Sequence, residues 1–198
     1  MFDALEGIDR SIVLAINGTH TAFLDKCFWI ISGKFTWIPL YILLLYLVWK
    51  QFGWKKTGLF LLIVGLCIAV VDTSSVYFFK EAFQRYRPSH HTFLKPRLHF
   101  YQLENGDFYL GGQYGFISSH ASNFFAFSTL AGLTLRKYYS KLIWILFALA
   151  ALVCYSRIYL GVHYLSDVFV GGLWGFIWAW LFYHFLVKRF LFEQIKIN

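Results

Sequence analysis

Three short blocks of the sequence carry residue types that together could break a phosphate ester. Within the 198 residues of the chain they supply three cations, two histidines, two serines and one carboxylate. These residues are Lys80, Arg87, Ser118, Ser119, His120, Arg157, His163 and Asp167. Arginine binds phosphate oxygens through its planar fork, and lysine binds them as a point charge. The set predicts an anion site with acid–base and nucleophilic groups that requires no metal.

Two of the blocks have spacings that suit this chemistry. His163 and Asp167 are four residues apart, which on a helix places both side chains on one face in neighbouring turns. A carboxylate so placed can accept the proton of one imidazole nitrogen and leave the other free as a nucleophile. A surface pair at a helix start is the alternative interpretation. Ser118 and Ser119 precede His120 at the start of an apolar run, so a hydroxyl and backbone N–H groups would face an anion from a helix N-terminus.

The composition places these blocks in a membrane protein. Hydrophobic residues make up 59% of the chain and charged residues 14%, and the mean hydropathy is +0.56. Soluble proteins average about 45–50% apolar and about 25% charged residues. The many aromatic residues suit lipid contact and the interfacial belts of a membrane protein.

Five apolar segments are long enough, or nearly so, to cross a bilayer, which requires about 20 apolar residues per helix. These segments are 28–49, which Lys34 and Pro39 interrupt, 57–79, 119–135, 142–155 and 168–187. Apolar residues at helical spacing from Phe2 to Ile16 predict an amphipathic N-terminal helix that stops near Asn17-Gly18. It either lies at the membrane interface or packs as a terminal helix. We therefore expect residues 1–198 to form one all-α, multi-span membrane helix bundle.

Charge divides the two sides of this topology. Nine cations fall in the connections 50–56 and 136–141 and in the C-terminal tail, with Glu193 as the one acid among them. The other nine cations are balanced by nine acids. The positive-inside rule makes the basic side cytoplasmic. All three blocks lie on the other side, so we expect an integral plasma (inner) membrane protein whose site faces the periplasm or the extracellular side.

Other polar residues and small residues have weaker implications. The polar stretch 85–115 contains Asn105-Gly106 between aromatic-rich runs, which indicates either a small hairpin lid or an irregular loop. Asn123 could orient His120 or join helices, and Asp72 could tune Lys80 or be solvated. Histidines at 90, 91 and 99 lack metal-ligand spacing, and solvent or headgroup contact is favoured for them. Small residues at 171, 175 and 179, and at 118, 122 and 126, predict close helix packing.

The joint spacing of the three blocks resembles the signature of the type-2 phosphatidic acid phosphatase family, which shares a fold with vanadium haloperoxidases. That signature reads K-x6-R-P, then P-S-G-H, then S-R-x5-H-x3-D. Segments 80–88 and 156–167 match the first and third blocks in full. The middle block reads Ile-Ser-Ser-His at 117–120, so the serine and histidine are kept and the proline and glycine are replaced. We expect serine to be tolerated at 119 because a span start has a helical φ, which does not require glycine.

The resemblance implies a two-step reaction. His163 would attack phosphorus to give a phosphohistidine, and His120 would protonate the leaving oxygen and then activate water. Asp167 would orient His163. The groups implied to hold the phosphoryl oxygens are Lys80, Arg87, Ser118, Ser119 and Arg157. The resemblance implies no metal or cofactor, and we expect no nucleic acid and no obligatory protein partner, only the membrane and a lipid phosphate.

The expected function is therefore hydrolysis of a lipid phosphate or pyrophosphate. Candidate substrates are undecaprenyl pyrophosphate, phosphatidate, phosphatidylglycerol phosphate and a lipid A phosphate, and the short chain with compact loops favours a polyprenyl pyrophosphate. Phosphotransfer to another lipid or sugar is the alternative among enzymes, and the membrane spans disfavour a haloperoxidase. A protein that only binds or moves lipids is the alternative from another class. It is disfavoured because binding alone requires neither the two histidines nor Asp167.

Overall fold

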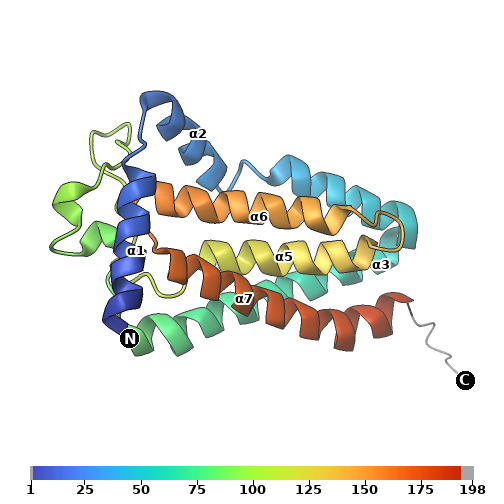
Figure 1. Ribbon diagram of the computed structural model, residues 1–198. Coiled ribbons are helices and arrows are strands. Elements are labelled where there is room, and N and C mark those ends of the chain that lie inside the picture. The colour runs from blue at the N-terminus through green and yellow to red at the C-terminus, as the bar shows by residue number, and fades with distance from the viewer. Residues whose placement is uncertain (1, 193–198) are drawn as a thin grey trace, which may run out of the picture.

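The computed structural model describes residues 2–192, which form helices and loops without a β-strand (Figure 1). The α-helices are α1 (Phe2–Asn17), α2 (Ala22–Ser32), α3 (Ile38–Ser75), α4 (Glu81–Phe83), α5 (Ser119–Leu135), α6 (Leu142–Tyr159) and α7 (Leu165–Phe182). Two π-helical segments, η1 (Val76–Lys80) and η4 (Tyr183–Phe192), continue α3 and α7, and the loop after α4 holds the 3-10 turns η2 (Pro88–His90) and η3 (Lys95–Arg97). The predicted all-α class is confirmed.

The bundle makes five helical passes, because α3 reverses direction in its middle. Gly53 has a φ of 76° and a ψ of 170°, which interrupts the helix at a conformation that glycine adopts without strain. The two arms of α3 therefore run antiparallel (Figure 1). In the described part of the chain, three helical runs are long and apolar enough to cross a membrane: Ile38–Phe83, Leu142–Tyr159 and Leu165–Phe192. The run Ile38–Phe83 makes two passes through the bundle and each of the other two runs makes one. The helix α5 makes the fifth pass.

One of the predicted spans has wrong boundaries. The sequence predicts a span over 28–49, but Phe28 belongs to the separate helix α2, and the span begins at Ile38. The Trp37 Nε1–H donates to the carbonyl of Ile31 at 2.9 Å, so the connection itself satisfies the end of α2. Pro39 then stands in the first turn of α3, where its missing N–H is harmless.

The other predicted spans agree with helices and differ from them at the ends. Segment 119–135 coincides with α5, and 57–79 covers the second arm of α3 and most of η1, within the helical run Ile38–Phe83. Segment 142–155 extends to Tyr159, so that Arg157 is part of its helix. Segment 168–187 lies within Leu165–Phe192.

The pair α5 and α7 packs most closely, through the small residues that the sequence indicates. A Cβ at Gly175 would lie 1.9 Å from the carbonyl oxygen of Ser122, and a Cβ at Gly171 would lie 2.7 Å from that of Ser118. Both separations are far below van der Waals contact. The two helix backbones therefore touch directly, and this contact fixes the position of the first turn of α5 relative to α7.

Gly175→Ala is therefore expected to lower the unfolding free energy by at least about 1–3 kcal/mol, the usual cost of overpacking. The melting temperature in detergent measures the loss. Gly65→Ala in α3 is the matched control, because a Cβ there would meet nothing within 4 Å. An equal melting temperature for the wild type and Gly175→Ala would contradict the close contact of α5 and α7.

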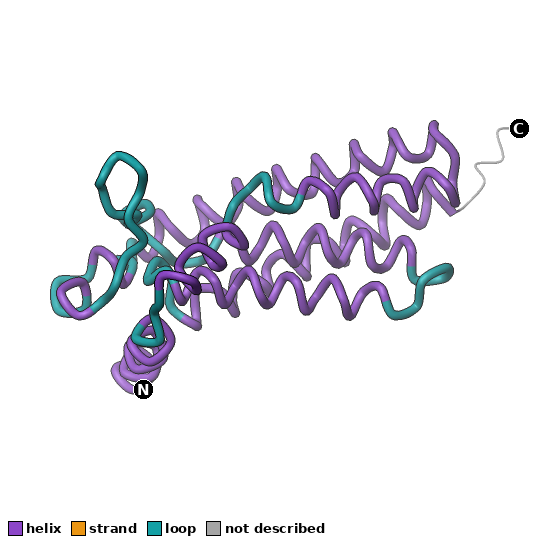
Figure 2. Tube along the Cα trace, turned by 90° about the horizontal axis from the view of Figure 1, so that it is seen from above, coloured by secondary structure: helices purple, strands orange, loops and turns teal. Residues whose placement is uncertain are grey.

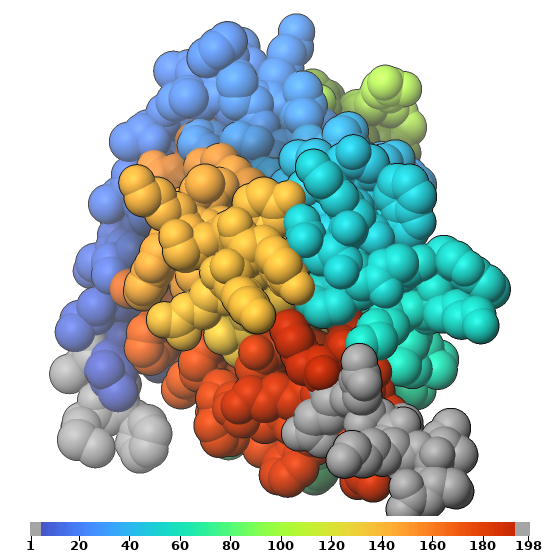
Figure 3. Space-filling view, turned by 90° about the vertical axis from the view of Figure 1, so that its right-hand side faces the viewer, coloured from blue at the N-terminus to red at the C-terminus, as the bar shows by residue number. Residues whose placement is uncertain are grey.

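The predicted basic side corresponds to one end of the bundle. Figure 3 looks onto this end, where the reversal of α3, the 136–141 connection and η4 come together. Lys56 Nζ donates to the carbonyl of Leu191 at 2.6 Å, and Gln51 Nε2 donates to the Tyr139 hydroxyl at 3.3 Å. Two residues counted in the prediction, Glu193 and Lys196, lie outside the described residues.

The other end carries most of the loop structure and α1 (Figures 1 and 2). The predicted N-terminal helix is confirmed, and it lies across the end of the bundle (Figure 1). Val13 is buried against the bundle, whereas Leu5 and Ile8 are 56% and 55% exposed. The helix packs through one side and keeps apolar side chains on another, which is the pattern of an interfacial helix.

The polar stretch turns back at the predicted place, but it forms no hairpin of strands. The N–H of Leu103 donates to the carbonyl of Asp107 at 2.8 Å, and Gly106 has a φ of 86°. A single bridge joins Gln102 to Phe108. The irregular-loop interpretation is therefore the better description.

Candidate active site

The three blocks meet at the end of the bundle that carries α1. The described structure places Lys80 at the end of η1, Arg87 in the loop after α4, Ser118, Ser119 and His120 at the start of α5, Arg157 in the last turn of α6, His163 just before α7 and Asp167 in its first turn. Six segments thus converge on one site. The loop residues are held by the helices on either side of them.

His163 is buried and has a defined tautomer. Its side chain is only 1% exposed, and its Nε2 lies 3.0 Å from Arg87 Nη1. Arginine can only donate, so Nε2 must be the accepting nitrogen without a proton. The proton then lies on Nδ1, which is 3.4 Å from Asp167 Oδ2. Nε2 therefore carries the unprotonated lone pair that a nucleophile requires, and this lone pair accepts the Arg87 N–H.

Asp167 reaches His163 from a position that the sequence does not predict. His163 precedes the helix rather than lying on its face, because Tyr164 is the N-cap and Asp167 is the third residue of α7. The predicted shared helical face is therefore wrong. Asp167 Oδ2 accepts the N–H of Tyr164 at 2.9 Å, so the carboxylate caps the helix and contacts the imidazole at the same time.

Arg85, which the sequence does not single out, ties Asp167 to α1. Its Nη1 lies 3.0 Å from Asp167 Oδ1 and 2.7 Å from Ser166 Oγ, and its Nη2 lies 2.8 Å from Asp9 Oδ2. Asp9 also accepts the N–H of Ser166 at 3.0 Å. The one feature of the sequence that could have drawn attention to Arg85 is its position as a further cation between Lys80 and Arg87. Its partner, 76 positions away on an amphipathic helix, has no sequence signature.

Arg87 is held by a loop that has room for it only because glycines line that loop. The N–H of Arg87 donates to the carbonyl of Gln113 at 3.1 Å, and its Nε donates to that of Tyr114 at 3.2 Å. A Cβ at Gly115 would lie 2.9 Å from Arg87 Cγ, and a Cβ at Gly111 would lie 2.9 Å from Arg87 Nη1. The glycines let the backbone approach the guanidinium and hold it against His163.

The start of α5 fits the predicted anion site in part. Ser118 is the N-cap, and its hydroxyl accepts the N–H of Ala121 at 3.5 Å, while its own N–H donates to the carbonyl of Asp167 at 3.0 Å. Ser119 is the first residue of the helix, so the expected helical conformation is confirmed. Lys80 Nζ lies 2.6 Å from Ser119 Oγ. The side chain of Ser119, rather than that of Ser118, therefore faces the cations.

His120 and Arg157 line a cavity of about 450 Å³ beside this helix start. Arg157 is only 2% exposed; its Nη1 donates to the Ser32 hydroxyl, and its Nη2 donates to the Tyr109 hydroxyl at 2.8 Å. Lys34 also lines the cavity. The sequence treats Lys34 only as an interruption of a span, because nothing in its spacing shows that the end of α2 lies beside Arg157.

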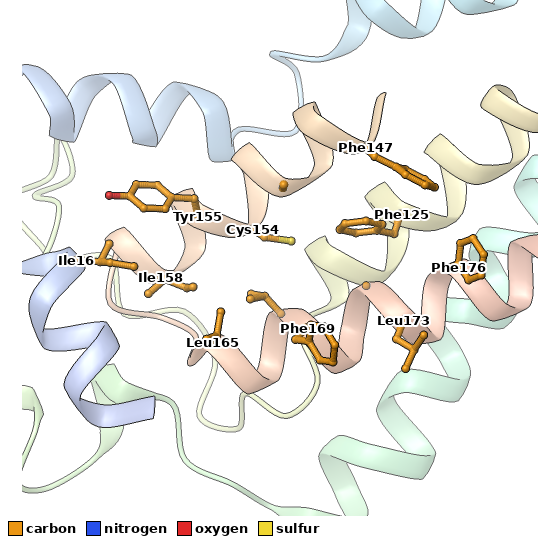
Figure 4. A pocket seen from close by; sticks show the side chains of 13 residues that line it. Ile16, Phe125, Phe147, Cys154, Tyr155, Ile158, Leu165, Phe169, Leu173 and Phe176 are labelled. Carbon is orange, nitrogen blue, oxygen red and sulfur yellow. The ribbon is translucent and has the colours of Figure 1, made fainter. Parts of the chain in front are cut away.

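A second cavity, of about 470 Å³, lies between α6 and α7 with α5 as its floor (Figure 4). Its walls are apolar and include Phe125, Phe147, Ile158, Phe169 and Phe176. Such a surface suits hydrocarbon chains but offers no cation to bind a phosphate. Of the two cavities, the one beside the start of α5 is therefore the one that contains predicted site residues, His120 and Arg157.

Other singled-out residues have structural partners. Asn123 Nδ2 lies 3.5 Å from Asp72 Oδ1, so the pair joins α5 to α3, in agreement with the helix-joining alternative. His99 Nε2 lies 2.8 Å from Asp25 Oδ2, and His91 Nε2 lies 3.1 Å from Arg10 Nη2. No group of three metal-ligating side chains occurs among residues 2–192.

The environment of His163 has a consequence for pH dependence. Burial, aided by the nearby charges of Arg87, Arg157 and Lys80, lowers the pKa of His163 well below its ordinary value. The imidazole therefore stays neutral and nucleophilic as the pH falls through about 6.5, where an ordinary histidine takes up its proton. NMR titration of ring-labelled histidine in detergent tests this, with the signal identified by its loss in His163→Gln. A midpoint at or above about 6.5 would contradict the burial argument.

A membrane helix bundle with this histidine–carboxylate pair, a second histidine and converging cations defines the class of integral membrane lipid phosphatases. The chain belongs to the PAP2 superfamily, whose family model matches residues 57–191. The family expected from the three blocks is therefore confirmed, and the protein is a phosphatase enzyme rather than a non-catalytic lipid binder.

Similar proteins agree with this membership. A lipid A 4'-phosphatase from Porphyromonas gingivalis is 35% identical over 96% of this chain and 75% of its own length. Another from Bacteroides thetaiotaomicron is 32% identical over 92% of this chain and 79% of its own length.

Two solved structures share the fold. The transmembrane PAP2-type phosphatidylglycerolphosphate phosphatase from Bacillus subtilis has a TM-score of 0.69 at 21% identity, covering 96% of this chain and 90% of its own. LpxE from Aquifex aeolicus has a TM-score of 0.60 at 23% identity, covering 90% of this chain and 96% of its own.

Proposed function

We propose that this enzyme removes a phosphate group from lipid A, through a phosphohistidine formed on His163. The observation that carries the reaction type is the buried Nε2 of His163, whose unprotonated lone pair accepts the Arg87 N–H. The names of the two relatives favour lipid A over the polyprenyl pyrophosphate that the chain length suggests. The 4'-phosphate is the corresponding position in those relatives.

In the first step, Nε2 of His163 attacks phosphorus, and the bond from phosphorus to the sugar oxygen breaks. His120 donates a proton to that oxygen, so the sugar leaves as an alcohol. Arg87 must release Nε2 for this attack, and its N–H can then bind a phosphoryl oxygen instead. Asp167 stabilises the positive charge that develops on the imidazole of His163.

In the second step, His120 takes a proton from water, and the resulting hydroxide attacks phosphorus. The phosphorus–nitrogen bond breaks, inorganic phosphate leaves, and His163 regains its lone pair. Lys80, Arg87, Arg157 and the N-terminal turn of α5 at Ser118 and Ser119 would hold the phosphoryl oxygens in both steps. The proton that His120 takes from water replaces the one that it gave to the sugar oxygen in the first step, so the protons balance.

The proposed orientation places this site on the periplasmic or extracellular side of the inner membrane. Its support is the basic end of the bundle, opposite the site, which the positive-inside rule makes cytoplasmic. Cysteine labelling with a membrane-impermeant reagent in intact spheroplasts tests it. A cysteine introduced at Glu104 should react, and one introduced at Trp54 should not.

Phosphate release from a panel of lipids tests the substrate. We expect the purified enzyme to release phosphate from lipid A faster than from undecaprenyl pyrophosphate, phosphatidate or phosphatidylglycerol phosphate, and a chelator should leave the rate unchanged. A faster rate on undecaprenyl pyrophosphate would overturn lipid A as the substrate. Transfer of labelled phosphate to a second lipid, instead of to water, would establish the phosphotransferase alternative.

A further inference from the structure

We propose that Trp29, Tyr101 and Tyr109 form a subsite for the sugar ring of a phosphorylated glycolipid. This assignment rests on the proposed function, because it names the residues that would recognise the headgroup of such a substrate. The three rings, here called the aromatic corner, meet where the last turn of α2 contacts the turn that follows η3. None of them belongs to the three blocks of the family signature.

The aromatic corner is a fixed wall. The rings of Trp29 and Tyr101 stack with centroids 4.5 Å apart and planes 6° apart, and Tyr109 meets Trp29 edge-on at 5.0 Å. The N–H of Tyr109 donates to the carbonyl of Tyr101 at 2.9 Å, which fixes the two tyrosines side by side. All three residues are half-buried, so part of each ring remains accessible. A ligand would meet a surface that needs little reordering on binding.

Trp29 borders two cavities, of which one belongs to the catalytic site. The first is the cavity of about 450 Å³ that contains His120 and Arg157. The second has a volume of about 410 Å³ and is lined by Trp29, Tyr101, Leu103, Glu104 and Asn105. The group that carries a phosphate bound at Arg157 would therefore lie against the aromatic corner, with the second cavity beyond it.

Tyr109 connects the corner directly to the phosphate-binding cation. Its hydroxyl accepts from Arg157 Nη2 at 2.8 Å, and its ring touches Trp29. A substrate oxygen bonded to Arg157 is thus one side chain away from the stacked rings. The short separation between Arg157 and the rings suits a phosphate attached directly to a sugar ring more than a phosphate at the end of a long spacer.

The mixture of groups in the second cavity fits a sugar. A pyranose ring has an apolar face of C–H bonds, which packs on aromatic rings, and a rim of hydroxyl groups, which need donors and acceptors. Glu104 supplies an exposed carboxylate, and Asn105 supplies an amide whose orientation is set by its bonds to Asp107 at 2.8 and 3.1 Å. The small headgroup of phosphatidate would leave this cavity unfilled. The geometry therefore points to a phosphorylated sugar.

Kinetics on two substrates test the subsite. Tyr101→Leu and Glu104→Gln are compared with the wild type on lipid A and on phosphatidate in the same detergent. We expect kcat/KM on lipid A to fall about tenfold or more in Tyr101→Leu, and phosphatidate turnover to stay within about twofold, because only the glycolipid reaches the rings. Tyr138→Leu is the matched control, since Tyr138 meets Phe52 edge-on at 5.8 Å at the basic end.

Two kinetic results would overturn the subsite: an unchanged kcat/KM on lipid A, or equal losses on both substrates, which would show that Tyr101 only supports the fold. Calorimetric titration with glucosamine 4-phosphate provides an arm that is independent of turnover. Binding to the wild type that weakens about tenfold in Tyr101→Leu supports the subsite. If the same wild-type protein hydrolyses no lipid, that result refutes the proposed function and leaves the subsite standing. Absence of binding to the wild type overturns the subsite and leaves phosphatase activity unaffected.

Discussion

His163→Ala is expected to lower kcat by at least about 10⁴-fold, the scale of loss when a nucleophile that acts as part of a unit is removed. The reason is that Nε2 of His163 is the nitrogen without a proton, beside Arg87, and Asp167 holds the proton on the other nitrogen. Phosphate release from lipid A measures the loss. Brief incubation with labelled substrate should also trap an acid-labile phosphoenzyme in the wild type, and no label should appear on His163→Ala.

His184→Ala is the control for this substitution. His184 lies in η4 at the basic end, and its Nδ1 lies 2.9 Å from the carbonyl oxygen of Trp180. Its replacement should leave kcat unchanged within about twofold, as expected for a surface substitution away from the site. Residual activity of His163→Ala within tenfold of the wild type would remove His163 as the nucleophile and leave His120 as the remaining candidate.

Arg85→Ala is expected to lower the unfolding free energy by about 3–5 kcal/mol, because it leaves buried carboxylates without their counter-charge. Asp167 is 0% exposed and Asp9 is 5% exposed, and one guanidinium bonds to both. The melting temperature in detergent measures the loss of stability. We also expect kcat to fall, since an untethered Asp167 no longer holds His163, and Arg85→Lys should restore part of both.

Arg10→Ala is the matched control for Arg85→Ala. Arg10 forms its ion pair with Glu6 at 2.7 Å on the same helix as Asp9, but the two side chains are 38% and 41% exposed. An exposed pair of this kind contributes about 0–1 kcal/mol. Equal melting temperatures for the two variants would show that Arg85 makes no special contribution to the site.

The convergence of the eight residues at one end of the bundle could be predicted from the sequence, because the spacing of their blocks is specific and each block adjoins an apolar run. The basic side could also be predicted, since charge counts need no knowledge of contacts. The family follows from the same blocks. The lipid headgroup could not be derived in the same way, because chain length and loop size carry little information about it.

Residues that act through tertiary contacts could not be predicted. Arg85 and Asp9 meet only because α1 crosses the end of the bundle, and Ser32 reaches Arg157 only because α2 is a separate helix. The position of His163 was wrong for a related reason. Four-residue spacing suggests a shared helical face, but Asp167 bonds to the backbone of Tyr164, which is the N-cap, so the helix begins only at Leu165.

The link between Asp9 and Ser166 spans 157 positions of the chain, from its first helix to its last. During synthesis, residues at the two ends of this link leave the ribosome far apart in time. Asp9 and Arg85 cannot complete their bonds until α7 has entered the membrane and brought Ser166 and Asp167 to the site. The full network of bonds that joins α1, Arg85 and α7 can therefore form only as a late event of assembly.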